Sequence, residues 1–485
     1  MLATIKRLYT PWNLLILIIL LVAFVLRTYR ISELLGFWYD QGRDALVIWD
    51  LIHNGKMFLI GPMMGNTGIF RGPWYYYMLA PFYYIGEGNP VIPAVFLVFL
   101  SVVGLYVLYK IAVELDGIKL AVLSVTIASV SSYIIGASRW LSNPTPTLLT
   151  GVLFIYFMYR FLEKKKWALP LAVFTIGMGL NFGAATEVYL VPALLFILYI
   201  FRKKLTFDWK IISFSIGLFV FSFLPQILFE VRHGGVMSKA FYDFVINKNS
   251  FTYKFWEILP HRMLEFYNLF YSKFWVDGAL TFLPFFIIFI FYLVINLKRY
   301  WVDDKFKILF IVFLSPFLGT LFFVSNLGGF YDYYFTAFYF IFILFFSFVL
   351  LKTNKIFVCL FLLILIFKNT SNYMENYSVD INKSDLISLK SQISAIEWIR
   401  KDSEGSQFNV DVYVPPVVPY AYEYLFLWRN LRQSENQTSL LYTLVEADLN
   451  HPARIEAWLK RQEKIGNIIY EQRFGGITVQ RRERI

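Results

Sequence analysis

Three carboxylates and a guanidinium lie close together near the start of the chain, in FWYDQGRDALVIWD at residues 37–50. They belong to Asp40, Arg43, Asp44 and Asp50, and aromatic residues surround them. Charges beside an apolar span are costly unless they face water, a partner or a substrate. A carboxylate in such a place can take a proton from an attacking hydroxyl. Asp40 and Asp44 are therefore the first candidates for catalysis.

Groups that could bind an anionic leaving group are spread along the chain. They are Arg43 in the same segment, Arg71 in GNTGIFRGPWYYYMLAP, Arg139 in ASRWLSNPTP, and Glu230, Arg232 and His233 in LPQILFEVRHGG. Arginine suits bidentate phosphate contacts, but beside aromatic residues it can equally anchor a helix at the membrane interface. Ion pairing of Arg43 with an aspartate, or of Arg232 with Glu230, is the simpler interpretation for those residues.

Two further acidic residues and the histidines complete the inventory. Glu187, at the start of an apolar segment, and Asp332, in GGFYDYYF, are more often structural hydrogen-bond partners than site residues. The four histidines show no HExxH-type spacing, which argues against zinc. Asp40, Asp44 and a lipid phosphate could together hold a divalent cation, so a metal is an open alternative. The chain has no P-loop and no Gly-rich dinucleotide motif.

The composition is that of a polytopic membrane protein, because 58% of residues are hydrophobic and 20% are aromatic. The net charge of +12 does not indicate nucleic-acid binding, since the basic residues form short clusters between apolar segments. The one cysteine, Cys359, lies in an apolar segment and allows no disulfide within the chain.

About eleven apolar segments are predicted to cross the membrane as helices. They are residues 13–29, 91–109, 119–137, 146–162, 167–181, 186–201, 210–230, 279–297, 307–324, 334–351 and 355–367. The first has no convincing cleavage site and is expected to be a retained signal anchor. Residues 167–201 are too long for one crossing and contain Gly177, Gly179 and Gly183, so two short helices joined by a tight outer turn are expected.

The distribution of basic residues predicts that the N-terminus is inside and the C-terminus outside. Lysines and arginines cluster near 110–119, 160–166, 202–210, 298–307 and 352–355, which become cytoplasmic loops. The short outer loops near 138–145, 182–185 and 325–333 contain only Arg139. The protein is therefore expected in the plasma membrane, with the first-loop acids facing the extracytoplasmic side.

Two domains are expected. The membrane domain comprises residues 1–369 with a large first outer loop at 30–90, in which 42–54 has the apolar spacing of an interfacial helix. Residues 370–485 have ordinary composition and predict a small outer α/β domain. Its expected helices lie in ISLKSQISAIEWIRKDS and VPYAYEYLFLWRN, and its expected strands in QFNVDVYVP, GNIIYEQRF and GITVQRRER, the last two joined at Gly475–Gly476.

The order of these features resembles that of the GT-C membrane glycosyltransferases. A first span, an outer loop with YDQGRDA, then GNTGIFRGPWYYYMLAP, ASRWLSNPTP and many short spans resemble the protein mannosyltransferases and aminoarabinose transferases of bacterial type, over roughly residues 1–370. The resemblance implies a polyprenyl-phosphate sugar donor, inversion at the anomeric carbon, and a first-loop acid as base or acceptor ligand. Asp40 matches that acid. The family often has Asp-Glu where this chain has Asp40-Gln41, and Asp44 could supply the second carboxylate one helical turn later.

The leading hypothesis is a lipid-linked-sugar glycosyltransferase with an unknown lipid, glycan or protein acceptor. A transporter or flippase of lipid-linked or small polar substrates is the alternative, but transporters usually carry charges near mid-span, and these spans are nearly free of them. A structural membrane protein with a partner-binding outer domain is the third interpretation, and it leaves the first-loop acids unexplained.

Overall fold

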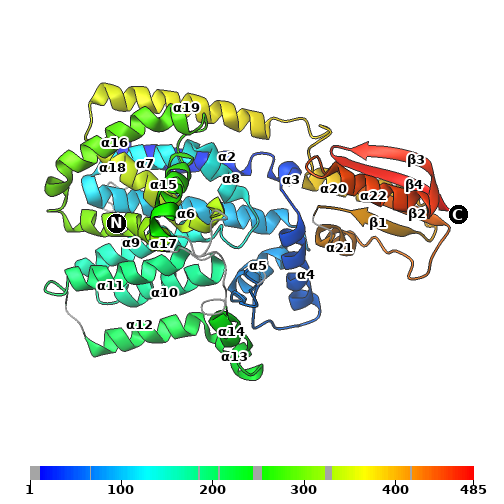
Figure 1. The fold of residues 1–485 in the computed structure, drawn as a ribbon, viewed down its shortest axis with the longest axis horizontal. Coiled ribbons are helices and arrows are strands. Elements are labelled where there is room, and N and C mark those ends of the chain that lie inside the picture. Colours follow the sequence, from blue (N-terminus) through cyan, green and yellow to red (C-terminus); the bar gives the residue numbers. More distant parts are fainter. Residues whose placement is uncertain are drawn as a thin grey trace, which may run out of the picture.

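The protein is described from a computed structural model over residues 11–65, 67–183, 186–205, 208–243, 254–322, 330–415 and 418–485. Among the described residues, helices and the loops between them form the chain as far as Tyr377. A four-stranded sheet lies near the C-terminus (Figure 1). Parts of two predicted outer loops, residues 184–185 and 325–329, lie outside the described residues.

Over its described residues, each apolar segment predicted to span the membrane lies on one or two helices. The helices are α2 (Pro11–Thr28), α6 (Val91–Asp116), α7 (Ile118–Val130), α8 (Ser132–Arg139), α9 (Thr147–Leu162), α10 (Ala168–Phe182), η1 (Thr186–Tyr189), α11 (Leu190–Ile200), α12 (Trp209–Ser222), α13 (Leu224–Arg232), α16 (Ala279–Tyr300), α17 (Asp304–Phe322), η3 (Asp332–Phe338), α18 (Tyr339–Leu350) and α19 (Lys355–Tyr377). Among the described residues, five helices are long and apolar enough to cross a membrane, or up to seven if each bent pair is one span. The count of eleven crossings stays a prediction.

Two segments expected to be single helices are bent. Helices α7 and α8 meet at 65° around Ser131, whose hydroxyl accepts the N–H of Ile134 and caps α8. Helices α12 and α13 meet at 60° around Phe223, where Pro225 follows at the start of α13. Proline has no N–H for the preceding turn, and a serine cap begins a new helix, so each break has a local cause.

The membrane domain is organised around α18, YFIFILFFSFVL, in which every residue is buried. A helix that is apolar on all sides must be enclosed by other helices. Helices α6, α7, α9, α16 and α17 all pack against it. Its phenylalanines form the centre of an aromatic core in which Phe313 and Phe345 stack with ring centroids 4.0 Å apart.

Ion pairs gather the basic loops at one end of the helices. They join Arg160 and Lys305 to Glu114, Lys204 to Asp304, Lys166 to Asp208, and Lys352 to Asp116. The first outer loop and the C-terminal domain lie together at the opposite end (Figure 1). The two sets of loops that the charge pattern assigns to different sides of the membrane are thus separated in space.

The first outer loop contains α3 (Ile31–Leu34), α4 (Tyr39–His53) and α5 (Trp74–Ile85). The helix predicted at 42–54 is confirmed as α4, and it buries Ala45 and Ile48. Further along the chain, α14 (Val236–Tyr242) and α15 (Phe255–Tyr271) lie between α13 and α16.

The C-terminal domain is an α/β unit. Its elements are α20 (Leu389–Asp402), β1 (Asn409–Tyr413), α21 (Tyr420–Trp428), β2 (Leu440–Glu446), α22 (Pro452–Glu463), β3 (Gly466–Phe474) and β4 (Ile477–Arg484), with sheet order β1-β2-β4-β3. Strands β1 and β2 are parallel and the other pairs antiparallel. The two expected helices fall on α20 and α21 and the three expected strands on β1, β3 and β4, whereas β2 and α22 were not predicted.

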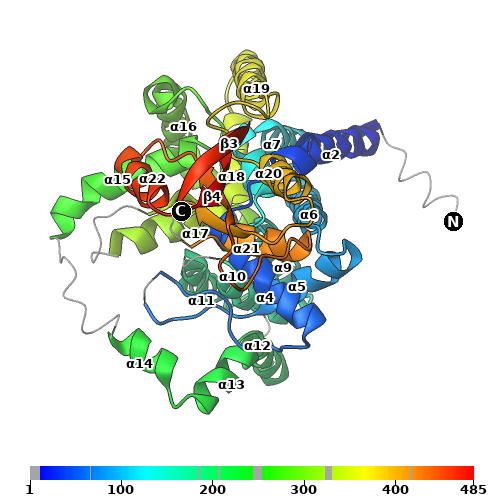
Figure 2. The ribbon, with the colours of Figure 1, turned by 90° about the vertical axis from the view of Figure 1, so that its right-hand side faces the viewer.

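The C-terminal domain shares one hydrophobic core with the first outer loop. Ala45 and Ile48 of α4 belong to the same buried cluster as Tyr422 and Leu425 of α21. Seen from that end, the domain lies in front of the membrane helices (Figure 2). The backbones of α4 and α21 come so close at Gly42 that an added Cβ would overlap Ala421. Only glycine permits this approach.

Replacing Gly42 by leucine should separate α4 from α21, because overpacking a closed interface costs about 1–3 kcal/mol. We expect the variant to release the C-terminal domain faster than wild type on limited trypsin digestion and to exchange the α4 amides faster. Gly217→Leu is the control, since nothing lies within 4 Å of a Cβ built there. Equal digestion rates for Gly42→Leu and wild type would contradict the proposed interface.

Candidate active site

Gln41 fixes the first turn of α4, which is the turn that carries Asp40. The Trp38 N–H donates to Gln41 Oε1 at 3.1 Å, and Gln41 Nε2 donates to the Leu141 carbonyl at 3.2 Å. Gln41 is buried and ties the start of α4 to the loop after α8. A glutamate could accept the first bond but could not donate the second. The glutamine at this position therefore has a structural role, and Asp40 is left in the first turn.

Arg43 lies between the two candidate carboxylates. Its Nη1 is 2.7 Å from Asp40 Oδ1, and its Nη2 is 2.7 Å from Asp44 Oδ1. The Arg43 Nε also donates to Asp44 Oδ1 at 2.9 Å, and the Tyr76 hydroxyl donates to the same oxygen at 3.3 Å. One guanidinium thus holds both carboxylates in fixed positions.

The two aspartates differ in exposure. The Asp40 side chain is 53% exposed, whereas that of Asp44 is 6% exposed. Burial raises the pKa of Asp44 to about 6, although the charge of Arg43 opposes the shift. Asp40 is therefore open to solvent, whereas Asp44 is enclosed with Arg43 and Tyr76.

Arg71 lies in the loop between α4 and α5, which the membrane helices hold tightly. An added Cβ at Gly72 would overlap Asn181 of α10, and Trp74 Nε1 donates to the Ser222 carbonyl at 2.7 Å. The bend after α12 thus exposes a backbone acceptor that fixes Trp74. The close approach of Asn181 explains why a glycine follows Arg71.

The Arg71 side chain makes no hydrogen bond or ion pair among the described residues, and its Nε is buried. Burial lowers the pKa of Arg71, while the charges of Glu187 and Asp44 raise it. Glu187 is itself buried against Gly179 and Gly183. Arg71 is thus a cation near two carboxylates with donors still available for an anion.

A pocket of about 850 Å³ opens beside the start of α4. Trp38, Trp140, Trp275 and six tyrosines line it, and we call it the aromatic pocket. Burial raises the pKa of Tyr333, one of these tyrosines, and the charges of Arg71 and Asp40 act on it in opposite directions. Trp38 lies two residues before Asp40, so the pocket begins beside the helix that carries the exposed carboxylate.

Comparison with known proteins gives the fold and a partial family match. A model of the dolichyl-phosphate-mannose-protein mannosyltransferase family matches residues 71–227, and no curated protein matches the chain. The crystal structure of ArnT from Cupriavidus metallidurans bound to undecaprenyl phosphate superposes with a TM-score of 0.60 at 10% identity, covering 98% of each chain. The chain therefore shares the fold of ArnT.

Two further structures agree with this assignment. The apo form of the same ArnT has a TM-score of 0.60 at 10% identity and covers 96% of this chain and 97% of its own. The apo oligosaccharyltransferase of Archaeoglobus fulgidus has a TM-score of 0.50 at 12% identity, over 88% of this chain and 64% of its own. The resemblance stated from the motifs is thereby confirmed for the fold.

The Arg139 side chain bonds to the backbone and aromatic residues around it. It is buried, and its Nη1 donates to the carbonyls of Arg27 at 2.9 Å and Tyr29 at 2.8 Å. Its guanidinium stacks on the ring of Tyr377 at 4.3 Å from the centroid. These contacts join the ends of α2, α8 and α19, and they leave Arg139 behind one wall of the aromatic pocket.

The residues predicted around the end of α13 lie beside the loop that carries Arg71. Glu230 accepts the N–H groups of Met237 and Ser238 at 2.9 and 2.8 Å, so it caps α14. Arg232 is exposed, and His233 stacks on Phe229. Phe229 in turn contacts Phe70, next to Arg71, and Ala240 of α14 lies close to Gly68 of the same loop.

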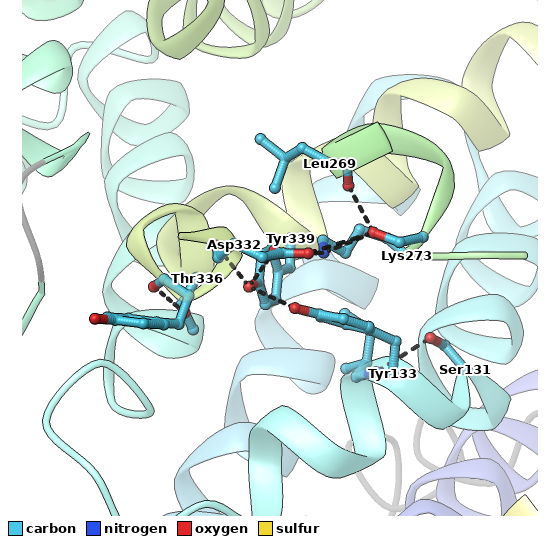
Figure 3. Close-up of polar contacts among 10 residues, drawn as sticks. Ser131, Tyr133, Leu269, Lys273, Asp332, Thr336 and Tyr339 are labelled. Atoms are coloured by element: carbon cyan, nitrogen blue, oxygen red, sulfur yellow. Dashed lines mark hydrogen bonds and ion pairs between the residues drawn. The ribbon is translucent and has the colours of Figure 1, made fainter. Parts of the chain in front are cut away.

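One polar cluster was missed from the sequence. Lys273, in the loop after α15, has a fully buried side chain with Nζ 2.7 Å from both carboxylate oxygens of Asp332 (Figure 3). Its ammonium lies over the rings of Tyr133 and Tyr339 at 3.5 and 4.2 Å. Burial lowers the pKa of Lys273, and the Asp332 carboxylate opposes that shift. The only sequence signal is a lysine among aromatic residues in YSKFW, beside a span.

The buried state of Asp44 predicts a pH effect on stability. Its pKa is about 6 in the folded protein against an ordinary value of 3.8, so its contribution to stability is complete below pH 4 and lost as pH rises through 6. The difference corresponds to at most about 3 kcal/mol. Asp44→Asn cannot titrate, so the melting temperature of wild type should fall relative to that of the variant between pH 4 and 7.5. A constant difference in thermal unfolding over this range would contradict the burial of Asp44.

Proposed function

We propose that the protein is an inverting glycosyltransferase that moves a sugar from a polyprenyl-phosphate donor to an acceptor hydroxyl. The observation that carries the proposal is the half-exposed carboxylate of Asp40, which Arg43 holds two residues from Trp38 in the lining of the aromatic pocket. The mannosyltransferase match and the fold shared with ArnT, whose crystal structure contains undecaprenyl phosphate, support a lipid-phosphate donor.

The reaction is a single displacement at the anomeric carbon. The acceptor hydroxyl forms the new C–O bond while its proton passes to an Asp40 oxygen. The bond between the anomeric carbon and the phosphate oxygen breaks, and the polyprenyl phosphate leaves with the bonding electrons through an oxocarbenium-like transition state. One exposed base on the face opposite the leaving group gives inversion. Asp44 is a positioning residue, because it fixes Arg43 and hence Asp40.

Arg71 is the proposed ligand of the departing phosphate. Negative charge develops on the leaving group in the transition state, and a guanidinium with available donors in a largely dry site stabilises it strongly. Arg139 and Arg232 are weaker candidates, since the first donates to backbone carbonyls and the second is exposed at the end of α13. A divalent cation on Asp40 and the phosphate is the alternative source of positive charge, and Arg43 already supplies such charge between the carboxylates.

The site is proposed to face the extracytoplasmic side of the plasma membrane. The charge pattern of the loops supports this orientation, because the basic clusters lie at the opposite end of the helices from α4. A lipid-linked donor also needs no cytosolic nucleotide at the moment of transfer.

Asp40→Asn should lower sugar transfer by roughly 10²–10⁴-fold, because the amide cannot take the acceptor proton. The measurement is release of sugar from a panel of radiolabelled polyprenyl-phosphate sugars by protein in lipid. Asp50→Asn is the matched control, since Asp50 lies on the same helix and pairs with Lys56 away from the site. Wild-type rates in Asp40→Asn would refute the base, and lipid flipping in sealed vesicles without any transfer would favour the flippase.

Arg71→Met and Arg139→Met should fail in different ways. Loss of a donor to the developing phosphate charge should lower the transfer rate of Arg71→Met by roughly 10²–10³-fold with little change in melting temperature. Arg139→Met leaves two buried carbonyls without their donor and should lower stability by about 2–4 kcal/mol. Transfer assays and thermal unfolding on the same preparations separate the two effects. An active Arg71→Met protein would remove Arg71 from the mechanism.

A further inference from the structure

The aromatic pocket has the size and lining of a ligand site. The proposed reaction does not by itself identify the molecule that binds there. Its volume of about 850 Å³ lies within the range of small-molecule sites. Three tryptophans, Trp38, Trp140 and Trp275, and six tyrosines form its walls. Trp38 and Tyr331 are 49% and 64% exposed, so aromatic faces are open to an incoming molecule.

The pocket is nearly neutral. Among the described lining residues, Asp332 is the one acidic side chain, and none is a lysine, arginine or histidine. The charge of Asp332 is balanced by Lys273, whose Nζ is 2.7 Å from both carboxylate oxygens. A phosphate would find no cation in this lining, and a cationic peptide would find no uncompensated carboxylate.

The polar groups of the pocket are hydroxyls gathered around that carboxylate. The Tyr339 hydroxyl donates to Asp332 Oδ1 at 2.7 Å, and the Tyr133 hydroxyl is 3.3 Å from that of Tyr339 (Figure 3). Asp332 is still 34% exposed, so lone pairs of its carboxylate face the pocket. Aromatic faces beside a carboxylate and hydroxyls suit a sugar ring, which has an apolar C–H face and an edge of hydroxyls.

The pocket is walled by side chains from several elements. They come from α8, η3, the end of α19 and the loops after α8 and α15. A compact ligand recognised by side chains fits such walls.

We propose that the aromatic pocket binds a neutral sugar ring of a carbohydrate acceptor and presents one of its hydroxyls to Asp40. The pocket meets the acidic helix at Trp38, two residues before Asp40. The acceptor is thus a glycan, free or lipid-linked, rather than a protein side chain. This inference rests on the proposed glycosyl transfer for the direction of the reaction but not for the binding of sugar.

Binding can be tested without catalysis by protecting a cysteine in the pocket. Cys359 is the one cysteine of the chain, so Cys359→Ser gives a cysteine-free background. In it, Asn376→Cys places a thiol in the pocket lining, and Asn450→Cys places one on the exposed surface of the C-terminal domain. The rate of labelling by a sulfonated maleimide is measured in lipid nanodiscs with methyl glycosides and disaccharides of glucose, galactose, mannose and N-acetylglucosamine.

We expect at least one carbohydrate to slow labelling of Asn376→Cys threefold or more and to leave Asn450→Cys unchanged. Blocked serine and threonine peptides and undecaprenyl phosphate should have no effect on either. Protection by peptides or by undecaprenyl phosphate, with none by carbohydrates, would overturn the proposal. Protection by undecaprenyl-phosphate sugars alone would assign the pocket to the donor sugar and overturn the acceptor assignment.

Steady-state kinetics of the transfer reaction provide a second test of the acceptor site. Trp140→Leu and Tyr331→Ala should raise KM for a glycan acceptor roughly 3- to 10-fold and leave KM for the donor unchanged, since each removes an aromatic face from the pocket. Tyr470→Ala, at an exposed tyrosine of the sheet, is the control. A rise in donor KM alone would overturn the acceptor assignment. Protection by sugars without any measurable transfer would refute the glycosyltransferase and leave the carbohydrate site in place.

Discussion

The close approach of α4 to α21 at Gly42 is the contact on which the acidic site depends. A single helix lying at a membrane boundary has no fixed rotation of its own, because water and headgroups accept any of its polar faces. Here Ala45 and Ile48 are enclosed between α5 and the C-terminal domain, and burial of a side chain such as isoleucine is worth about 1.5–3 kcal/mol. The rotation of α4 is thereby fixed, with Asp40 outward and Asp44 inward.

That rotation separates two aspartates that are chemically identical. Both contact Arg43, yet one is half exposed and the other almost fully buried. Burial disfavours the charged form of Asp44. The ionised carboxylate is stable there because Arg43 and Tyr76 donate hydrogen bonds to it. The exposed Asp40 keeps an oxygen for the substrate. Different environments, rather than different residue types, give the pair its two roles.

Periodicity and charge were enough to predict most of the helices, the separation of the loops and the hairpin of the C-terminal domain, because these depend on local pattern. They were not enough for features set by tertiary contact. The bends at Ser131 and Phe223 depend on a cap and a proline that look ordinary inside apolar runs. Lys273 was missed because its partner Asp332 lies far along the chain. The start of α4 depends on Gln41 reaching a carbonyl of another loop, which no spacing rule reveals.

The cations of the outer end differ in how far the fold itself compensates them, and this difference bears on function. Lys273 has Asp332, Arg43 has two aspartates, and Arg139 has two carbonyls and a ring. Arg71 has electrostatic neighbours but no hydrogen bond to its buried Nε among the described residues. Leaving a buried donor unsatisfied costs about 1–3 kcal/mol, and a charged one costs more. Arg71 is therefore the cation of this group that the fold compensates least, and this is the basis for proposing it as the phosphate ligand.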